Sequence, residues 1–352
     1  MAAEIAPADG FLPWHADIAR QWLAARERFA HAWLIHGVAG IGKVRFARAA
    51  AAALLCETPQ AHLACGRCAA CQWLRSGNHP DFRALRPEAV ALAEGAPAEA
   101  DEAAPAADRA KKAPSRDIRI EQIRSLETWI NTATHRGGAR VVLLYPAEAL
   151  NAVSANALLK LLEEPPAGTI FLLVADTPDR LLPTLVSRCR RLPLALPPAG
   201  QARAWLDALG VPDAQAYLAA AGGAPLAAQR AFEAGAPACP GWFGQWLTAL
   251  AQRRAQALLP RLVDELEKVP AAEWLGVLQR GLTDLMLVQA GGAVRYYPSL
   301  AAPLAALAER LAPVAVAEAA RWLISQQRMA GHPLNPRLFI HSVLLRVTAI
   351  GA

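Results

Sequence analysis

The chain has 352 residues, of which 54% are hydrophobic and 19% charged, and its formal net charge is +6. This length and apolar content allow two or three domains with cores of their own. No apolar run of about 18 residues lacks a charge or a proline, and no basic stretch followed by an apolar one opens the sequence, so we expect neither a membrane span nor a secretion signal. These features predict a cytoplasmic protein, and the modest charge permits nucleic-acid contact without demonstrating it.

The first part of the chain alternates strand-like and helix-like segments. Residues 32–36, 140–144 and 170–174 are apolar runs of strand length, whereas residues 44–55 and 152–162 have the composition of helices. Strands that are apolar on both faces and alternate with helices are typical of a parallel sheet covered on both sides. We therefore predict an α/β domain over residues 1–192.

Residues 87–114 interrupt this domain with a change in composition to Ala, Glu, Asp and Pro, closing on basic residues. Such a stretch offers little large apolar surface to offset the entropy lost on ordering. We predict a flexible, solvated insertion here, with a short helix as the alternative.

After Leu192 the periodicity is helical throughout. Predicted helices span residues 201–209, 214–220, 242–259, 262–268, 274–289, 300–311, 316–329 and 338–350. They divide into a small helical lid, 193–236, and a helical collar domain, 237–352. The ten tryptophans fall within helical patterns, which favours core packing over base stacking.

A glycine-rich loop follows the first predicted strand. Residues 37–44 read Gly-Val-Ala-Gly-Ile-Gly-Lys-Val, and Gly37, Gly40, Gly42 and Lys43 fit a phosphate-binding loop placed between a strand and a helix. Val44 stands where a Ser or Thr hydroxyl would bind Mg²⁺. The sequence leaves open whether this degenerate loop binds ATP or is only a tight turn.

The acidic half of an ATPase site is also missing. An acidic residue at the end of a second strand normally holds Mg²⁺ and polarises water. Residues 140–144 are instead followed by Tyr145 and Pro146, and Glu148 lies three residues beyond Tyr145. Two independent absences predict that the chain does not hydrolyse ATP.

Four of the six cysteines cluster as C-x8-C-x2-C-x2-C, at Cys56, Cys65, Cys68 and Cys71. This spacing suits a tetrahedral zinc ion, and four thiolates close its coordination shell, so we predict structural Zn²⁺. Disulfides are the weaker interpretation in a reducing cytosol. Four unrelated core residues are the other alternative, which Arg67 and Gln72 disfavour. We expect His62 and His79 to be surface loop residues rather than ligands.

Several motifs together resemble one family. They are Asn-Ala-Leu-Leu-Lys-Leu-Leu-Glu-Glu-Pro-Pro at 156–166, Ser-Arg-Cys at 187–189, His-Pro-Asp-Phe at 79–82, Ile-Arg-Ile-Glu-Gln-Ile-Arg at 118–124 and Asn-Pro-Arg-Leu at 335–338. With a zinc loop directly after a phosphate-loop helix, they resemble the AAA+ clamp-loader subunits of bacterial DNA polymerase III. The likeness spans nearly the whole chain apart from the insertion.

The resemblance distinguishes among members of the family. Its active gamma and tau subunits carry Ser or Thr after the loop lysine and Asp-Glu at the second strand, where this chain has Val44 and Tyr145. The chain therefore resembles a non-hydrolysing member, and not delta, which generally lacks both the cysteine cluster and the Ser-Arg-Cys tripeptide. An ATP-hydrolysing subunit of the gamma or tau type is the alternative.

The resemblance implies a role for Arg188, the arginine of Ser-Arg-Cys. In the family it reaches the ATP of the adjacent subunit, whereas the residues alone would favour a pair with a local carboxylate. The implied partners are the gamma or tau and delta subunits of the DNA polymerase III holoenzyme and, through the assembly, the sliding clamp and primer–template DNA. A zinc-dependent nucleic-acid-binding module is the rival from another class.

Overall fold

The computed structural model describes residues 10–95, 113–132, 134–135, 138–330, 332 and 334–351. The chain divides into two compact units, Met1–Gln201 and Ala202–Ala352. The first unit holds the sheet and the second is helical. The finer division into a lid and a collar, with boundaries after residues 192 and 236, stays a prediction.

The first unit is built on a five-stranded sheet with the order β2-β3-β4-β1-β5. Its strands are β1 (Ala32–His36), β2 (Phe82–Leu85), β3 (Arg140–Leu144), β4 (Thr169–Ala175) and β5 (Arg190–Pro193). All the neighbouring strands run parallel. The predicted parallel α/β sheet is confirmed, and its three apolar strands are the central ones. The sequence did not predict β2 and β5, because short edge strands carry charged residues and no continuous apolar run.

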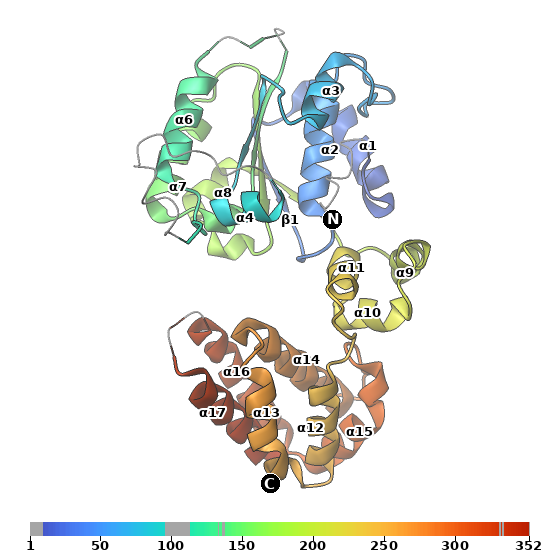
Figure 1. The fold of residues 1–352 in the computed structure, drawn as a ribbon. Helices are drawn as coiled ribbons and strands as arrows, with labels where there is room; N and C mark the ends of the chain where they lie inside the picture. The colour runs from blue at the N-terminus through green and yellow to red at the C-terminus, as the bar shows by residue number, and fades with distance from the viewer. Residues whose placement is uncertain are drawn as a thin grey trace. The chain divides into compact units, whose positions relative to one another are not determined.

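Helices cover both faces of this sheet. Among the residues described here, the helices are α1 (Ala16–Ala24), α2 (Lys43–Leu55), α3 (Ala69–Arg75), α4 (Glu88–Ala93), α6 (Ile120–Ile130), α7 (Ala152–Glu163) and α8 (Pro183–Arg188). Figure 1 shows α1, α2 and α3 on one side of the sheet and α6 and α7 on the other. All the alanines of α2 are buried, and such small side chains let this helix approach the sheet closely.

The insertion predicted at 87–114 is corrected at its start. Residues 88–93 form α4, with Ala91 buried. Glu88 accepts a hydrogen bond from the Ser115 backbone N–H at 3.2 Å, and Glu94 is paired with Arg48 at 2.8 Å. These polar contacts order a segment whose composition alone predicts a flexible loop. Residues 96–112 lie outside the described part of the chain.

The second unit contains two hydrophobic clusters. Its helices are α9 (Ala199–Ala208, which begins in the first unit), α10 (Ala214–Ala220), α11 (Pro225–Glu233), α12 (Gly241–Ala251), α13 (Leu259–Leu266), α14 (Ala271–Gln289), α15 (Ala301–Arg310), α16 (Pro313–Met329) and α17 (Pro336–Thr348). The smaller cluster is formed by α9 to α11 and the larger by α12 to α17. Trp242, Trp246 and Trp274 are buried in the larger cluster, as the helical pattern predicts.

The predicted helix over 242–259 is wrong in its second half. It ends at Ala251, and Arg253 has a positive φ of 59°. Three consecutive polar residues, 252–254, interrupt the apolar face there. Two smaller helical elements follow, a 3₁₀ turn at Ala255–Leu258 and then α13.

A buried carboxylate anchors the loop after α14. Asp284 is fully buried and accepts hydrogen bonds from the backbone N–H groups of Arg295 at 2.8 Å, Tyr296 at 2.9 Å and Tyr297 at 2.8 Å. A charged acceptor shared by three backbone donors is a strong local interaction. It fixes the connection between α14 and α15.

Within the described ranges, no single helix is both long and apolar enough to cross a membrane. The consecutive segments Pro298–Arg310 and Pro313–Met329 reach the required length and composition only together, and they are bent by 117° at the break between them.

Candidate metal centre and nucleotide loop

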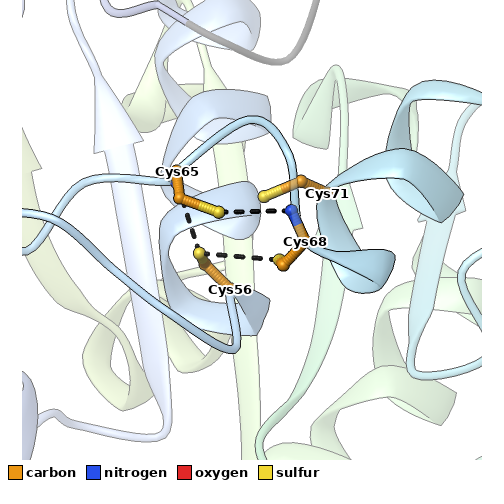
Figure 2. Close-up of side chains that lie close together, drawn as sticks. All are labelled: Cys56, Cys65, Cys68 and Cys71. Atoms are coloured by element: carbon orange, nitrogen blue, oxygen red, sulfur yellow. Dashed lines mark hydrogen bonds between the residues drawn. The ribbon is translucent and has the colours of Figure 1, made fainter.

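The four clustered cysteines come from the segment between α2 and α3. Cys56 directly follows α2, Cys65 lies in the loop, Cys68 precedes the first turn of α3, and Cys71 lies within α3. Figure 2 shows their side chains gathered between the end of one helix and the start of the other. Two helix ends and one loop therefore hold the four sulfurs together.

The four sulfur atoms all lie within 4.8 Å of one another. Those of Cys56 and Cys68 are 3.8 Å apart. Zinc–sulfur bonds of about 2.3 Å in a tetrahedron place neighbouring sulfurs about 3.8 Å apart, so the cluster has the size of a tetrahedral metal site. The donor set and its spacing fit a divalent metal ion.

Hydrogen bonds to sulfur support this arrangement. The backbone N–H of Cys65 donates to Cys56 Sγ, and that of Cys68 donates to Cys65 Sγ, each at 3.3 Å (Figure 2). The Thr58 hydroxyl donates to Cys65 Sγ at 3.2 Å. The Thr58 hydroxyl and then the backbone N–H groups lower the pKa of Cys65 to about 5. Donors directed at sulfur stabilise the thiolate, which is the form that binds a metal.

Burial acts in the opposite direction on the two deeper cysteines. It raises the pKa of both Cys56 and Cys71 above the ordinary value of a thiol. A bound cation would offset this effect, because the charge of the metal favours the deprotonated sulfur.

The two nearby histidines have different environments. His62 is exposed, as expected, and has a positive φ of 67° in the turn closed by the Gln60–Leu63 bridge. The expectation that His79 lies at the surface is wrong. It is 4% exposed, and its Nδ1 accepts the backbone N–H of Asp81 at 3.0 Å. The turn that leads into β2 buries the ring, and neither histidine belongs to the four-cysteine group.

The glycine-rich loop joins β1 to α2. Gly37, Gly40 and Gly42 all have positive φ, of 152°, 83° and 96°. A Cβ at Gly37 would lie 2.3 Å from the carbonyl oxygen of Leu194, so only glycine fits there. The backbone thus keeps the glycine conformations on which a phosphate-binding loop depends.

The loop lysine makes three polar contacts within the protein. Lys43 Nζ donates to the carbonyl oxygens of Gly37 at 2.8 Å and Val38 at 2.7 Å, and it pairs with Asp176 Oδ1 at 2.5 Å. Its side chain is 3% exposed, whereas that of Asp176 is 52% exposed. The ammonium is therefore enclosed by groups of this chain.

No acidic residue directly follows β3. Tyr145 takes this place, is buried, and donates its hydroxyl proton to Glu94 at 2.7 Å; burial is the main cause that raises its pKa to about 12. Arg48 contacts both Tyr145 and Glu94. Glu148 lies in the turn Ala147–Ala149 and accepts the backbone N–H of Thr177 at 2.5 Å. Glu148 therefore bridges two strand ends, and Tyr145 belongs to a closed polar cluster.

Arg188 is the last residue of α8, two residues before β5 begins. Its guanidinium donates to the carbonyl oxygen of Thr184 at 2.9 Å and is ion-paired with Glu163 at the end of α7. About a third of the side chain is accessible. Because Arg188 precedes a strand that runs parallel to β1, it lies at the edge of the sheet where the strands begin. The glycine-rich loop lies at the edge where they end.

Residues 18–197, just over half of the chain, match the family model described as DNA polymerase III, delta subunit. The DNA polymerase III subunit delta' of Pseudomonas aeruginosa is 42% identical over 223 residues, covering 62% of this chain and 60% of that protein. That of Escherichia coli is 37% identical over 206 residues, covering 58% and 54%. The chain belongs to the delta-prime family of DNA polymerase III.

The similarity extends to another subunit type. The DNA polymerase III subunit tau of Salmonella typhimurium is 34% identical over 162 residues, which are 46% of this chain and 21% of that protein. The chain spans less than two thirds of the length of the two delta-prime relatives above.

The sequence did not predict two residues of these sites. Asp176 binds Lys43, and Glu163 binds Arg188. Asp176 directly follows β4, which neighbours β1. A polar residue directly after a strand was the one sequence feature that could have indicated a residue near the glycine-rich loop. Glu163 lies inside the Glu-Glu-Pro-Pro motif, but nothing in the spacing indicated which of its two carboxylates would face Arg188.

Proposed function

We propose that the chain is the non-hydrolysing, delta-prime subunit of a bacterial clamp loader and supplies Arg188 to an ATP molecule bound by a neighbouring gamma or tau subunit. In this role it assembles with gamma or tau and with delta in the cytoplasm. The assembly, part of the DNA polymerase III holoenzyme, loads the sliding clamp on primer–template DNA. The chain contributes half of a shared ATP site.

The observation that carries this proposal is the position of Arg188 relative to the chain's own loop. The register pairs Trp33 with Arg190 and His36 with Pro193. Five residues of parallel strand extend about 16 Å. Arg188 lies beyond one end of these strands, and Lys43 lies beyond the other end. Arg188 is therefore too far from the chain's own loop to contact a nucleotide there, and an ATP molecule that it contacts must be held by another subunit.

The chemistry of a guanidinium suits this task. It carries a fixed positive charge and a planar set of donors that can hold two phosphate oxygens at once. Charge develops on the transferred γ-phosphoryl group and on the leaving oxygen, and an arginine supplied in trans stabilises it. Arg188 is accessible enough to exchange Glu163 for such an oxygen.

The chain's own loop lacks two groups that ATP hydrolysis requires. Val44 offers no hydroxyl for Mg²⁺, and Tyr145 replaces the acidic residue after β3. Without these ligands the loop would hold no Mg²⁺ to stabilise the negative charge that develops on a phosphate during hydrolysis. These two absences support the proposal that the chain supplies an arginine to a neighbouring subunit and does not hydrolyse ATP itself.

We also propose that the metal of the four-cysteine cluster is zinc. Four cysteine sulfurs at tetrahedral spacing form the ligand set that selects zinc in a structural site. Zinc would join the end of α2 to the start of α3 and leave no coordination position for water or substrate.

The test is a rebuilt clamp loader that contains Arg188→Ala. Removing one arginine finger costs about 10³–10⁵-fold at the ATP site that it serves, so DNA-stimulated ATPase and clamp loading should both fall. Arg190→Ala, two residues away on an exposed side chain, is the matched control and should leave both rates near wild type. Undiminished rates with Arg188→Ala, or ATP turnover by the isolated chain that Lys43→Ala abolishes, contradict the proposal.

A further inference from the structure

We infer that Asp176 is the residue that closes the glycine-rich loop to polyphosphate ligands. The loop keeps its glycines, its lysine and the following helix, and the absence of metal ligands alone would slow hydrolysis without preventing binding. This inference deepens the proposed function and rests on it only in taking the chain's own loop as inactive.

The hydrogen-bond donors of Lys43 limit what a phosphate can contact. An ammonium has three N–H donors and no acceptor. Two donate to the carbonyl oxygens of Gly37 and Val38, and the third faces Asp176 Oδ1 at 2.5 Å. All three donors are therefore occupied, and a phosphate must displace at least one of these partners before it can bind Lys43.

The three partners of Lys43 differ in how easily they can move away. The two carbonyls belong to the loop itself and move only with its backbone. Asp176 follows β4 directly, and β4 pairs with β1 so that Ala175 lies beside His36. The sheet register thus brings a carboxylate from a distant segment to the start of the loop, and this partner is a side chain that can turn away.

The charge of Asp176 also opposes the approach of an anion. The Asp176 side chain is 52% exposed, whereas Lys43 is 3% exposed. An approaching polyphosphate therefore meets the negative charge of Asp176 on the accessible side of the pair. It must break the ion pair and also tolerate a like charge nearby, and both effects oppose binding. With a neutral side chain at 176, Lys43 and the first N–H groups of α2 remain as an anion-binding arrangement.

The experiment compares the full-length wild type with Asp176→Asn by isothermal titration calorimetry, using MgATP and, separately, sodium tripolyphosphate. Asparagine keeps the size and one acceptor oxygen but removes the charge. We expect no measurable binding to the wild type, and binding to Asp176→Asn that is at least about tenfold tighter than the limit set by the wild type. Tripolyphosphate separates recognition of the phosphates from recognition of the nucleoside.

Four further variants extend the comparison. Asp179→Asn makes the same change at a nearby exposed carboxylate that does not contact Lys43, and should give no gain. Asp176→Glu keeps the charge and should leave the loop closed. Lys43→Ala added to Asp176→Asn should remove the gained binding. Asp176→Ser is a second neutral variant should the asparagine variant fold poorly.

Two outcomes overturn the inference. One is a folded neutral variant, asparagine or serine, that binds neither ligand. The other is a wild-type chain that binds MgATP as tightly as Asp176→Asn. Neither outcome bears on Arg188, which is tested in the assembled complex. ATP hydrolysis by the isolated wild-type chain would instead defeat the proposed function itself.

Discussion

Arg188 at the end of α8 is ion-paired with Glu163 at the end of α7, across 25 residues of sequence. Both side chains are partly accessible, at 34% and 49%. An exposed pair of this kind contributes about 0.2–1 kcal/mol to stability. The pair therefore sets the direction of the guanidinium more than the stability of the fold.

The first prediction concerns Glu163→Gln in the assembled clamp loader. Glu163 and a γ-phosphate would compete for the same guanidinium, so weakening the ion pair should favour the phosphate. We expect the KM for ATP in the DNA-stimulated ATPase assay to fall by about 1.4- to 5-fold, which corresponds to the free energy of such a pair. A loss of activity like that of Arg188→Ala would show instead that Glu163 holds the arginine in its productive position.

The second prediction concerns the metal. We expect about one zinc per chain by mass spectrometry of the purified protein, and none after Cys71→Ser or prolonged chelation. Loss of the metal frees the segment between α2 and α3 and should cost more than about 3 kcal/mol, which lowers Tm by about 6–12 °C. Cys189→Ser, at a buried cysteine outside the cluster, should keep its zinc. Full zinc content in Cys71→Ser would contradict a four-cysteine site.

The third prediction is a dependence of stability on pH that comes from His15. Burial, and then the charge of Lys43, lowers the pKa of His15 to about 4, and neither ring nitrogen has a hydrogen-bond partner within the described structure. In the unfolded chain the pKa returns to about 6.5. Between these values the unfolded state binds more protons. The stability that depends on neutral His15 is therefore fully present above about pH 6.5. As the pH falls towards 4, the free energy of unfolding decreases by up to about 3 kcal/mol.

The measurement is urea unfolding at pH 7.5 and pH 4.5 for the wild type and for His15→Leu. The leucine has no proton to gain, so its loss of stability between the two pH values should be smaller by about 2–3 kcal/mol. His341→Leu, at an exposed histidine, should retain the wild-type dependence. Equal pH dependence in wild type and His15→Leu would assign the effect to other groups.

The fourth prediction concerns Asp284→Asn in the second unit. The asparagine keeps one acceptor oxygen but turns an amino group towards backbone N–H donors, which leaves buried donors unsatisfied. We expect the free energy of unfolding to fall by about 2–4 kcal/mol. Urea unfolding monitored by tryptophan fluorescence measures this change. Asp264→Asn makes the same change in an exposed ion pair with Arg337 and should leave the free energy of unfolding near that of the wild type. Similar losses in both variants would deny Asp284 its anchoring role.

The sequence predicted those parts of the fold that depend on local pattern. The central strands at 32–36, 140–144 and 170–174 are apolar on both faces and could be recognised without knowing their neighbours. Strands β2 and β5 could not, because Arg83, Arg190 and Arg191 interrupt any apolar pattern and only pairing with the sheet makes these segments strands.

The candidate sites follow the same division. The four cysteines lie within 16 residues, so their spacing alone predicts that they meet. Lys43 and Asp176 are separated by 133 positions, and their contact depends on β4 lying beside β1. The absence of Mg²⁺ ligands could be predicted from the residue types at positions 44 and 145. The carboxylate that pairs with Lys43 could be identified only from the register of the sheet.

The two ends of a parallel sheet differ, because all its strands begin at one end and finish at the other. In this chain Arg188 lies at the end where the strands begin, which we call the front. The loop whose lysine is paired with Asp176 lies at the end where the strands finish, which we call the back. Subunits that join front to back form a directional row, which closes into a ring or grows without limit. If the chain supplies an arginine at one edge of its sheet and binds no ATP at the other, as proposed, it occupies one end of the row of working ATP sites. The proposed ring then contains fewer working ATP sites than subunits.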